Sequence, residues 1–375
     1  MLYRKMNKTD RKLSILGFGC MRLPQTADFV IDEVKATSMV RYAIDRGVNY
    51  IDTAYVYHNG ESEPFLGRAL ADGYRQKVNL ATKMPVWDVG SRMDMDRILD
   101  EQLRRLNTDH IDFYLLHGLS RSSWNYMVDL NVGEFFDGAI ADGRIRYAGF
   151  SFHDNVKVFK EIVDEYNWTF AQIQYNYMDE DYQAGTVGVN YAAEKGLGIV
   201  IMEPLRGGVL AKETSKTKKL WASGGQSHAA AEWGLRWLWN RPEITVVLSG
   251  MSTMQQVKDN LSYANDGKPS SLTANDLAVY EKIKTNYRSS IKIPCTTCRY
   301  CQPCMVGVGI PDCFAAYNDA FFYKDTAAAK FSYDTFTVSG GDASQCQDCG
   351  VCESLCPQKI LIRERLKEVV SLFGH

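Results

Sequence analysis

The sequence predicts an α/β fold, a closed (β/α)8 TIM barrel, followed by a small cysteine-rich domain. Between residues 14 and 263, short apolar runs alternate eight times with segments whose apolar residues recur every three to four positions. That alternation is typical of parallel strands joined by helices. Beyond this region the composition changes, because nine of the ten cysteines lie from Cys295 onward. The chain is therefore expected to contain a barrel and a second module.

The predicted strands are near-continuous apolar runs, such as Gly198-Ile-Val-Ile-Met202. A parallel sheet that is buried on both faces requires strands of this kind. The eight strands are predicted over Ser14–Gly19, Asn49–Ala54, Asn79–Met84, His110–His117, Ile145–Phe152, Phe170–Asn176, Gly198–Pro204 and Ile244–Gly250.

Each predicted strand is followed by a segment with helical periodicity. The helices are predicted over Asp32–Arg46, Glu61–Leu70, Met95–Leu106, Val132–Asp142, Asn155–Tyr166, Ala184–Lys195, Ser227–Asn240 and Thr253–Tyr263. Eight such units favour a closed barrel over an open doubly wound sheet. The open sheet is the alternative, but Gly17-Phe-Gly19 lacks the third glycine of a dinucleotide-binding fingerprint.

The expected domains are the barrel over residues 1–267, a helical connector over 268–294, and a ferredoxin-like iron-sulfur domain over 295–375. The connector contains a polar helical stretch around Asn275–Tyr287, and the last domain contains one at Ile362–Leu372. Both stretches have the spacing of apolar residues that helices show.

The overall composition is that of a soluble globular protein, with 45% apolar and 23% charged residues. The 43 basic and 45 acidic side chains are mixed along the chain, so no single-sign field is present to hold a nucleic acid or an anionic membrane surface. No apolar run approaches the length of a membrane span, and the first residues lack the apolar stretch of a signal peptide. The expected location is the cytoplasm.

Four polar side chains lie at or just beyond predicted strand ends: Asp52, Tyr57, Lys83 and His117. In a (β/α)8 barrel, catalytic groups lie at the carboxyl ends of the strands, so these four are expected to meet. A cation such as Lys83 would lower the pKa of a neighbouring phenol from its usual value near 10. Such a set suits proton delivery to a carbonyl oxygen that receives a hydride at its carbon. The alternative is an ion-pair network with a purely structural role.

Four motifs in this region resemble those of the aldo-keto reductases. They are Asn49-Tyr-Ile-Asp-Thr-Ala-Tyr-Val-Tyr57, Ala81-Thr-Lys83, Ile111-Asp-Phe-Tyr-Leu-Leu-His117 and Ile145-Arg-Tyr-Ala-Gly-Phe-Ser151. The resemblance covers roughly residues 1–263. It implies a barrel closed at the bottom by a hairpin near Leu2–Leu13, with NAD(H) or NADP(H) across the top. It also implies a small-molecule carbonyl substrate and Tyr57 as general acid, supported by the other three side chains.

The resemblance also implies a set of cofactor-binding positions. They are Gly19, Cys20, Asp52, Ser151, Gln174, Met202, Leu205, Gly250, Ser252, Gln256, Asp259 and Asn260. Met202 replaces the aromatic residue that usually stacks on the nicotinamide, and Phe152 replaces an asparagine. The segment Gly250–Gln256 lacks the lysine and arginine that would hold a 2′-phosphate. The choice between NADPH and NADH therefore stays open. Trp87 and Trp124 are candidates for walls of the carbonyl pocket.

The cysteines near the end of the chain follow a second pattern. Cys346, Cys349, Cys352 and Cys356, followed by a proline, have the C-x2-C-x2-C-x3-C-P spacing of bacterial ferredoxins. In that pattern the fourth cysteine binds the other cluster of a pair. A second run lies upstream and has one residue fewer before its last cysteine; its members are Cys295, Cys298, Cys301 and Cys304.

Exchange of the fourth ligands would give two 4Fe-4S clusters. One would be held by Cys295, Cys298, Cys301 and Cys356, and the other by Cys346, Cys349, Cys352 and Cys304. A single cluster and structural zinc are the alternatives, but three successive two-residue gaps provide more sulfurs than one tetrahedral ion binds. The tail resembles the ferredoxin-like extension of a subgroup of aldo-keto reductases.

Two functions are compatible with these features. The first is an NAD(P)H-dependent carbonyl reductase that carries an iron-sulfur module. The second is an electron-transfer, redox-sensing or docking protein whose clusters exchange electrons with a partner protein. The intact set of four catalytic residues favours the enzyme, because a scaffold has no need of it.

Overall fold

A computed structural model describes residues 1–226, 228–337 and 340–374 of the chain. The chain forms two compact units: Met1–Pro204 with Leu235–Ser271, and Leu205–Gly234 with Leu272–His375. This division differs from the predicted ranges 1–267, 268–294 and 295–375. Residues 205–234 pack against the predicted connector, because the rings of Trp221 and Trp233 lie 5.4 and 5.6 Å from that of Tyr280. The connector packs against the cysteine-rich segment through Tyr287, whose ring stacks on that of Phe322 at 5.4 Å.

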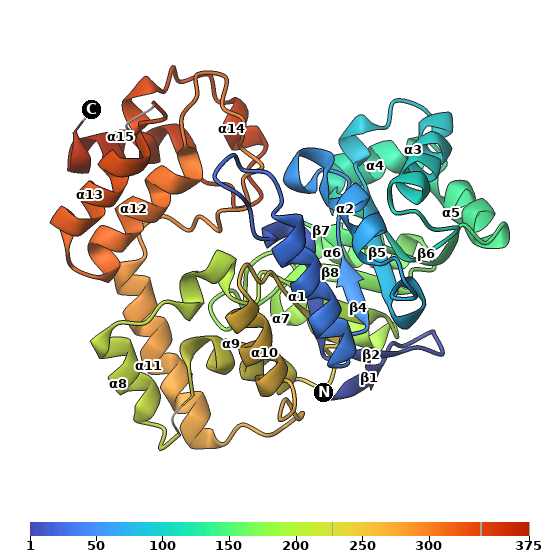
Figure 1. The fold of residues 1–375 in the computed structure, drawn as a ribbon, viewed down its shortest axis with the longest axis horizontal. Helices are drawn as coiled ribbons and strands as arrows, with labels where there is room; N and C mark the ends of the chain where they lie inside the picture. Colours follow the sequence, from blue (N-terminus) through green and yellow to red (C-terminus); the bar gives the residue numbers. More distant parts are fainter. Residues whose placement is uncertain (227, 338–339, 375) are drawn as a thin grey trace. The chain divides into compact units, whose positions relative to one another are not determined.

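The first unit contains a closed barrel of eight parallel strands in the order β10-β3-β4-β5-β6-β7-β8-β9. Figure 1 shows helices on the outside of these strands. The strands are β3 (Leu16–Gly19), β4 (Tyr50–Asp52), β5 (Asn79–Met84), β6 (Ile111–Leu119), β7 (Ile145–Phe152), β8 (Phe170–Gln174), β9 (Gly198–Met202) and β10 (Val246–Ser249). All eight predicted strands are confirmed, and the predicted barrel with them.

The helices of the barrel follow the predicted spacing. They are α1 (Glu33–Asp45), α2 (Ser62–Ala69), α3 (Arg92–Arg105), α4 (Arg121–Asp129), α5 (Val132–Ala141), α6 (Val156–Glu165), α7 (Gly185–Glu194), α9 (Ala230–Trp239) and α10 (Met254–Tyr263). Helix α4 was not predicted; it buries Trp124 and Met127. The predicted start of α9 at Ser227 lies outside the described residues.

A two-stranded hairpin closes the amino-terminal end of the barrel, as the family resemblance implied. Strands β1 (Tyr3–Lys5) and β2 (Lys12–Ser14) pair antiparallel. Met6 and Leu13 are buried in the same cluster as Tyr50 and Phe170, which lie at or near the starts of their strands. The core of the barrel is therefore packed at this end, which leaves the carboxyl ends of the strands for a functional site.

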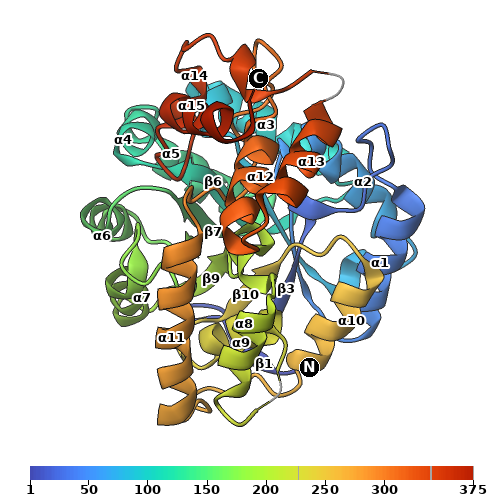
Figure 2. The ribbon, with the colours of Figure 1, turned by 90° about the vertical axis from the view of Figure 1, so that its left-hand side faces the viewer.

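In the part of the second unit that the structure describes, the regular elements are helices. Its helices are α8 (Ser215–Ala222), α11 (Ala274–Ser290), α12 (Ile310–Phe322), α13 (Thr326–Thr337), α14 (Val351–Ser354) and α15 (Ile362–Phe373), together with the first part of α9. Helix α12 packs against α13 and α15, as Figure 2 shows. Phe314, Tyr333 and Val369 contribute to the shared core. The prediction of a single helical stretch after residue 295 was wrong, because α12 and α13 precede α15.

In the described part of the chain, no helix combines the length and apolarity needed to cross a lipid bilayer.

Candidate functional site

A buried lysine lies at the centre of the candidate active site. The Nζ atom of Lys83 donates to Asp52 Oδ1 at 2.7 Å and to the backbone oxygen of Thr53 at 2.6 Å. It also donates to the Tyr57 hydroxyl at 3.3 Å. The side chains of Lys83 and Asp52 are 1% and 3% exposed. One ammonium group thus joins a carboxylate to a phenol at the carboxyl ends of two neighbouring strands.

Strand register and a tight turn bring these groups together. Asp52 at the end of β4 pairs in register with Ala81 of β5, two residues before Lys83. Tyr57 begins the short helix η2 (Tyr57–Gly60). His58 and Asn59 have φ angles of 52° and 56°, in the left-handed region. The backbone therefore departs from helical geometry directly after Tyr57, whose hydroxyl accepts from Lys83.

Burial and neighbouring charges set the protonation of the site. Burial raises the pKa of the Asp52 carboxyl, while the Lys83 ammonium acts in the opposite direction. Burial lowers the pKa of His117 well below its usual value, with further lowering from Lys83 and His153. The imidazole of His117 is therefore neutral at pH 7, so it can donate one N–H without carrying a charge.

Two aromatic rings flank His117, which lies on β6. Its ring centroid is 6.1 Å from that of Tyr57 and 5.1 Å from that of Trp87. Trp87 is 55% exposed, so its indole has one face on His117 and a large exposed part. Trp124, the other tryptophan considered for the pocket, is buried against Trp168 with the ring centroids 5.6 Å apart. Trp87 thus contacts one of the predicted catalytic residues through its ring.

A buried polar network behind Lys83 was not predicted. Glu63 Oε1 accepts from Thr82 Oγ1 and from Gln102 Nε2, both at 2.6 Å. Gln102 Nε2 also donates to the backbone oxygen of Lys83 at 3.0 Å, and Gln102 Oε1 accepts from Tyr114 at 2.6 Å. Glu63 and Gln102 lie on the buried faces of α2 and α3. A polar residue at an apolar position of each predicted helix was the available signal.

Several expected cofactor-binding residues lie at the same strand ends. Gly19 ends β3, and a Cβ there would lie 3.5 Å from the backbone oxygen of Ser249. Cys20 is fully buried, and burial raises the pKa of its thiol, with Asp52 adding to the increase. Ser151 Oγ accepts from the Gly118 backbone N–H at 2.7 Å. Gln174 and Met202 end the adjacent strands β8 and β9.

The turn from β10 into α10 carries the remaining expected positions. Gln256 Oε1 accepts from the backbone N–H of Ser252 at 2.8 Å and takes part in the capping box of α10 with Thr253. Asn260 Nδ2 donates to Ser249 Oγ at 3.0 Å, and Asp259 Oδ1 accepts from the Gln255 side chain at 2.8 Å. Gly250 lies in this turn, between β10 and α10. Leu205 belongs to the second unit, where it precedes the short helix η5 (Arg206–Ala211).

The second unit holds the cysteines in two groups. Burial raises the pKa of the Cys301 thiol to about 12, and the neighbouring thiols that add to the increase are Cys298, Cys295 and Cys356. Burial likewise raises the pKa of Cys352 to about 11, and its neighbouring groups include Cys346, Cys349 and Cys304. Cys356 is thus a neighbour of Cys301, and Cys304 is a neighbour of Cys352.

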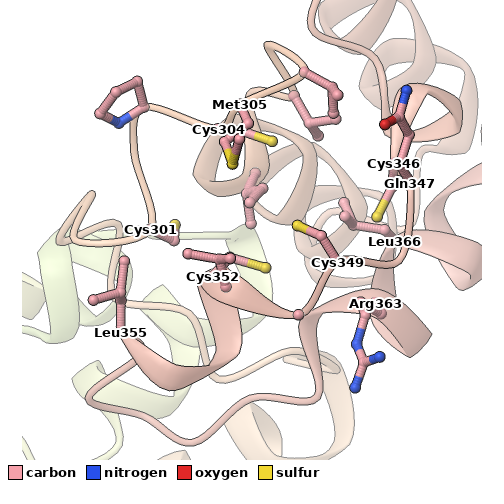
Figure 3. A pocket seen from close by; sticks show the side chains of 16 residues that line it. Cys301, Cys304, Met305, Cys346, Gln347, Cys349, Cys352, Leu355, Arg363 and Leu366 are labelled. Atoms are coloured by element: carbon pink, nitrogen blue, oxygen red, sulfur yellow. The ribbon is translucent and has the colours of Figure 1, made fainter.

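A pocket in this unit is lined by Cys301, Cys304, Cys346, Cys349 and Cys352. In Figure 3 the sulfur atoms of the last four point into a shared space, and Cys301 lies to one side. Among residues 1–226, 228–337 and 340–374, no three His, Cys, Asp or Glu side chains form an arrangement that could hold a metal ion. In the described part of the chain, these thiols therefore share a pocket without forming a ligand group for a single metal ion.

Comparison with known proteins covers the barrel. A model of the aldo/keto reductase family matches residues 15–274. The uncharacterized oxidoreductase YqkF of Bacillus subtilis (strain 168) is 29% identical over 71% of this chain and 92% of its own length. A probable aldo-keto reductase 1 of Glycine max is 28% identical over 54% of this chain and 58% of its own.

Among solved structures, the holo form of the aldo-keto reductase AKR11C1 from Bacillus halodurans is similar to this chain. It has a TM-score of 0.64 and 29% identity, with 76% of this chain and 96% of that one covered. The family match ends before the cysteine runs. The chain is therefore an oxidoreductase that belongs to the aldo/keto reductase family.

Proposed function

We propose that the barrel catalyses the NAD(P)H-dependent reduction of an aldehyde or ketone, with Tyr57 as the general acid. The observation that carries this proposal is the Lys83 ammonium between the Asp52 carboxylate and the Tyr57 hydroxyl. A cation beside a phenol favours the phenolate and so makes the phenol a stronger acid.

Each of the four side chains has a separate role in the proposed reaction. Bound NAD(P)H supplies the hydride to the carbonyl carbon. The Tyr57 hydroxyl donates its proton to the carbonyl oxygen, which gives an alcohol and a phenolate that Lys83 stabilises. Asp52 keeps Lys83 charged and oriented. Neutral His117 donates an N–H to the carbonyl oxygen, and the phenolate regains its proton from solvent.

We infer that residues at the strand ends bind the dinucleotide, as the family resemblance implies. Ser151 and Gln174 supply a hydroxyl and an amide in β7 and β8, and Gly19 ends β3. The Gly250–Gln256 turn carries no cation for a 2′-phosphate. Titration with NADH and NADPH, followed by tryptophan fluorescence, measures the preference between the two.

Tyr57→Phe tests the catalytic assignment. With a panel of aldehydes and ketones, we expect kcat to fall by about 10²–10⁴-fold, while NAD(P)H still binds. Tyr55→Phe is the matched control, since Tyr55 donates to Glu101 rather than contacting Lys83. An unchanged rate in Tyr57→Phe would overturn the assignment.

For the second unit we propose two 4Fe-4S clusters. The support is the ferredoxin spacing together with the neighbour sets around Cys301 and Cys352. Anaerobic purification should give iron and acid-labile sulfide. Cys304→Ser and Cys356→Ser should each lose about half of the iron, whereas the buried Cys313→Ser should lose none. Zinc without sulfide would overturn this proposal.

Electron exchange with a partner protein is a second candidate function. The observation that favours it is the exposure of Cys349, beside Met305, which is 85% exposed and lines the same pocket. A protein of this kind would have clusters that a partner reduces and would turn over carbonyls negligibly. Rapid carbonyl reduction by the purified chain alone would decide for the enzyme.

A further inference from the structure

A buried glutamate on α2 links three neighbouring elements of the barrel. The side chain of Glu63 is 0% exposed. Its Oε1 atom accepts from Thr82 Oγ1 of β5 and from Gln102 Nε2 of α3, both at 2.6 Å. Its Oε2 atom lies 3.6 Å from Arg105 Nη1, which is also on α3. A hydroxyl that donates over so short a distance is typical of an ionised acceptor, and Arg105 supplies the compensating charge.

Gln102 connects this carboxylate to the backbone of Lys83. Gln102 Nε2 donates to the backbone oxygen of Lys83 at 3.0 Å, and Gln102 Oε1 accepts from the Tyr114 hydroxyl at 2.6 Å. A backbone oxygen only accepts hydrogen bonds, so the NH2 end of Gln102 must face Lys83. The second hydrogen of the same NH2 group then faces Glu63. The carboxylate thus holds Gln102 in the orientation that reaches Lys83.

Thr82 connects Glu63 to the same strand a second time. Successive side chains of a strand point to opposite faces. Thr82 accordingly reaches Glu63 on the helix side of β5, while Lys83 Nζ reaches Asp52 Oδ1 inside the barrel. Glu63 is therefore connected to β5 at two successive residues, through the side chain of Thr82 and through the main chain of Lys83.

Glu63 also follows the proposed general acid closely along the chain. Helix α2 begins two residues after the short helix η2, and Glu63 lies in its first turn. The distance from Lys83 Nζ to the Tyr57 hydroxyl is 3.3 Å, just beyond the usual range of about 2.7–3.2 Å for a nitrogen donor. A small displacement of β5 relative to α2 would therefore break this contact.

We infer that Glu63 is a positioning residue that holds the main chain of Lys83 where its ammonium reaches the Tyr57 hydroxyl. The inference rests on the proposed function, because it concerns the proton donor of the carbonyl reduction. Glu63 is not proposed to contact the substrate or the cofactor; it acts through β5.

A comparison of Glu63→Ala with Glu63→Gln tests this inference through the pH dependence of carbonyl reduction. The alkaline limb of kcat reports the loss of the proton from the general acid in the complex with substrate. Tyr57 faces Lys83 of β5, whose partner is Asp52 of β4, and His117 of β6. These side chains are the same in the wild type and in both variants.

The two variants should differ because only one keeps the hydrogen bonds to β5. Glu63→Ala removes the acceptor of Thr82 and Gln102, so Lys83 should move away from Tyr57 and the phenol should become a weaker acid. We expect the alkaline limb to move to higher pH by about one unit and kcat at pH 7 to fall about tenfold. Glu63→Gln keeps an amide oxygen as the acceptor, so its limb should stay at the wild-type pH.

The direction of the movement separates positioning from a direct effect of the charge on Glu63. Loss of a nearby negative charge makes a phenol a stronger acid, which would move the limb to lower pH in both variants. A limb that moves to lower pH in both variants, or that does not move in Glu63→Ala, would overturn the inference.

Asp112→Asn is the matched control for the loss of a buried carboxylate. Asp112 is buried near the start of β6, where it accepts from the Leu80 backbone N–H and pairs with Arg75, both at 2.9 Å. Like Glu63→Ala, it should lower the thermal midpoint, but it should leave the alkaline limb in place. An equal movement in both variants would overturn the inference, because general loosening of the barrel would then be the cause.

Thr82→Val tests the same link if Glu63→Ala does not fold. It removes one donor to Glu63 at nearly constant volume and should move the limb in the same direction by a smaller amount; an unmoved limb would overturn the inference. Failure of the proposed function has a different result. A wild type that reduces no carbonyl, or an unchanged rate in Tyr57→Phe, overturns both, whereas an unmoved limb in a chain that depends on Tyr57 overturns the role of Glu63 alone.

Discussion

Replacing Lys83 with methionine removes the cation from a buried ion pair. Asp52 would then hold its charge in the barrel without the donor at 2.7 Å, and the backbone oxygen of Thr53 would lose its donor at 2.6 Å. Breaking a buried pair by removing one partner costs about 3–5 kcal/mol. We therefore expect Lys83→Met to lower the free energy of unfolding of the first unit by about 4 kcal/mol. The double variant Lys83→Met with Asp52→Asn should recover about half of that loss, because no unpaired charge remains.

The loss of unfolding free energy caused by Lys83→Met should also depend on pH. Burial already raises the pKa of Asp52, and removing Lys83 raises it further because the ammonium opposes this shift. The folded state then binds the proton more tightly than the unfolded chain, whose Asp pKa is about 3.9. The stability that this group contributes to the variant is fully present below the unfolded pKa. It is lost as the pH rises through the pKa of Asp52 in the folded state. The loss should thus be larger at pH 8 than at pH 5, and this dependence should vanish in the double variant.

Hydrogen exchange under native conditions in urea measures this effect in the first unit alone. Peptides that cover β4 and β5 report its opening, because core strands exchange through global unfolding. A loss below about 1 kcal/mol, or equal losses at pH 5 and pH 8, would refute the reasoning. A double variant as unstable as Lys83→Met would show that the charge on Asp52 is not the cause.

Three further predictions concern the barrel. Gly198→Ala should lower the free energy of unfolding by about 1–3 kcal/mol in calorimetry, because its Cβ would lie 1.6 Å from Met6 Sδ. Adding Met6→Ala should restore part of the loss. A Gly198→Ala variant as stable as the wild type would contradict this packing. Nitrogen-15 NMR should show a neutral His117 from pH 6 to 8, since burial lowers the pKa of His117 well below its usual value. The free energy of unfolding should fall as the pH drops below about 6.5, because there the unfolded chain takes up a proton on His117 that the folded chain does not. Gln102→Leu should cost about 1–3 kcal/mol for each buried polar group left without its partner, with Glu63 the most affected; a thermal midpoint equal to the wild type would argue against the network.

The barrel could be predicted because the hydrophobic patterns of its strands and of its helices differ and occupy separate stretches of the sequence. Apolar runs bounded by helical segments gave all eight strands, with Asn79–Met84 and Ile145–Phe152 at their observed limits. The second unit was harder. Helix α12 buries most of its residues on every side and lacks a polar stripe. Helix α8 lies in a basic run that is typical of a loop and buries only Thr217 and Trp221.

The convergence of Asp52, Tyr57 and Lys83 could be predicted because the topology of a parallel barrel places strand ends together. The contacts of Glu63 and Gln102 could not be predicted in the same way. Hydrogen bonds between buried polar groups depend on the axial position of each helix relative to the strands it packs on. The hydrophobic pattern of the sequence does not determine that position. A polar residue at a buried position of α2 and another at a buried position of α3 were the available signal.

The two proposed chemistries differ in electron count, and this difference limits what the clusters do. Hydride transfer from NAD(P)H to a carbonyl moves two electrons together and is complete without a cluster, which accepts one electron at a time. The barrel reaction therefore has no need of the cysteines. Cys295, Cys301, Cys304, Cys346 and Cys352 pack against the apolar core of the second unit, so metal bound there would also hold that core together. Chelation of the iron should accordingly destabilise the second unit and leave carbonyl reduction by the barrel unchanged. Loss of carbonyl reduction in step with iron loss would instead place the clusters in the reaction itself.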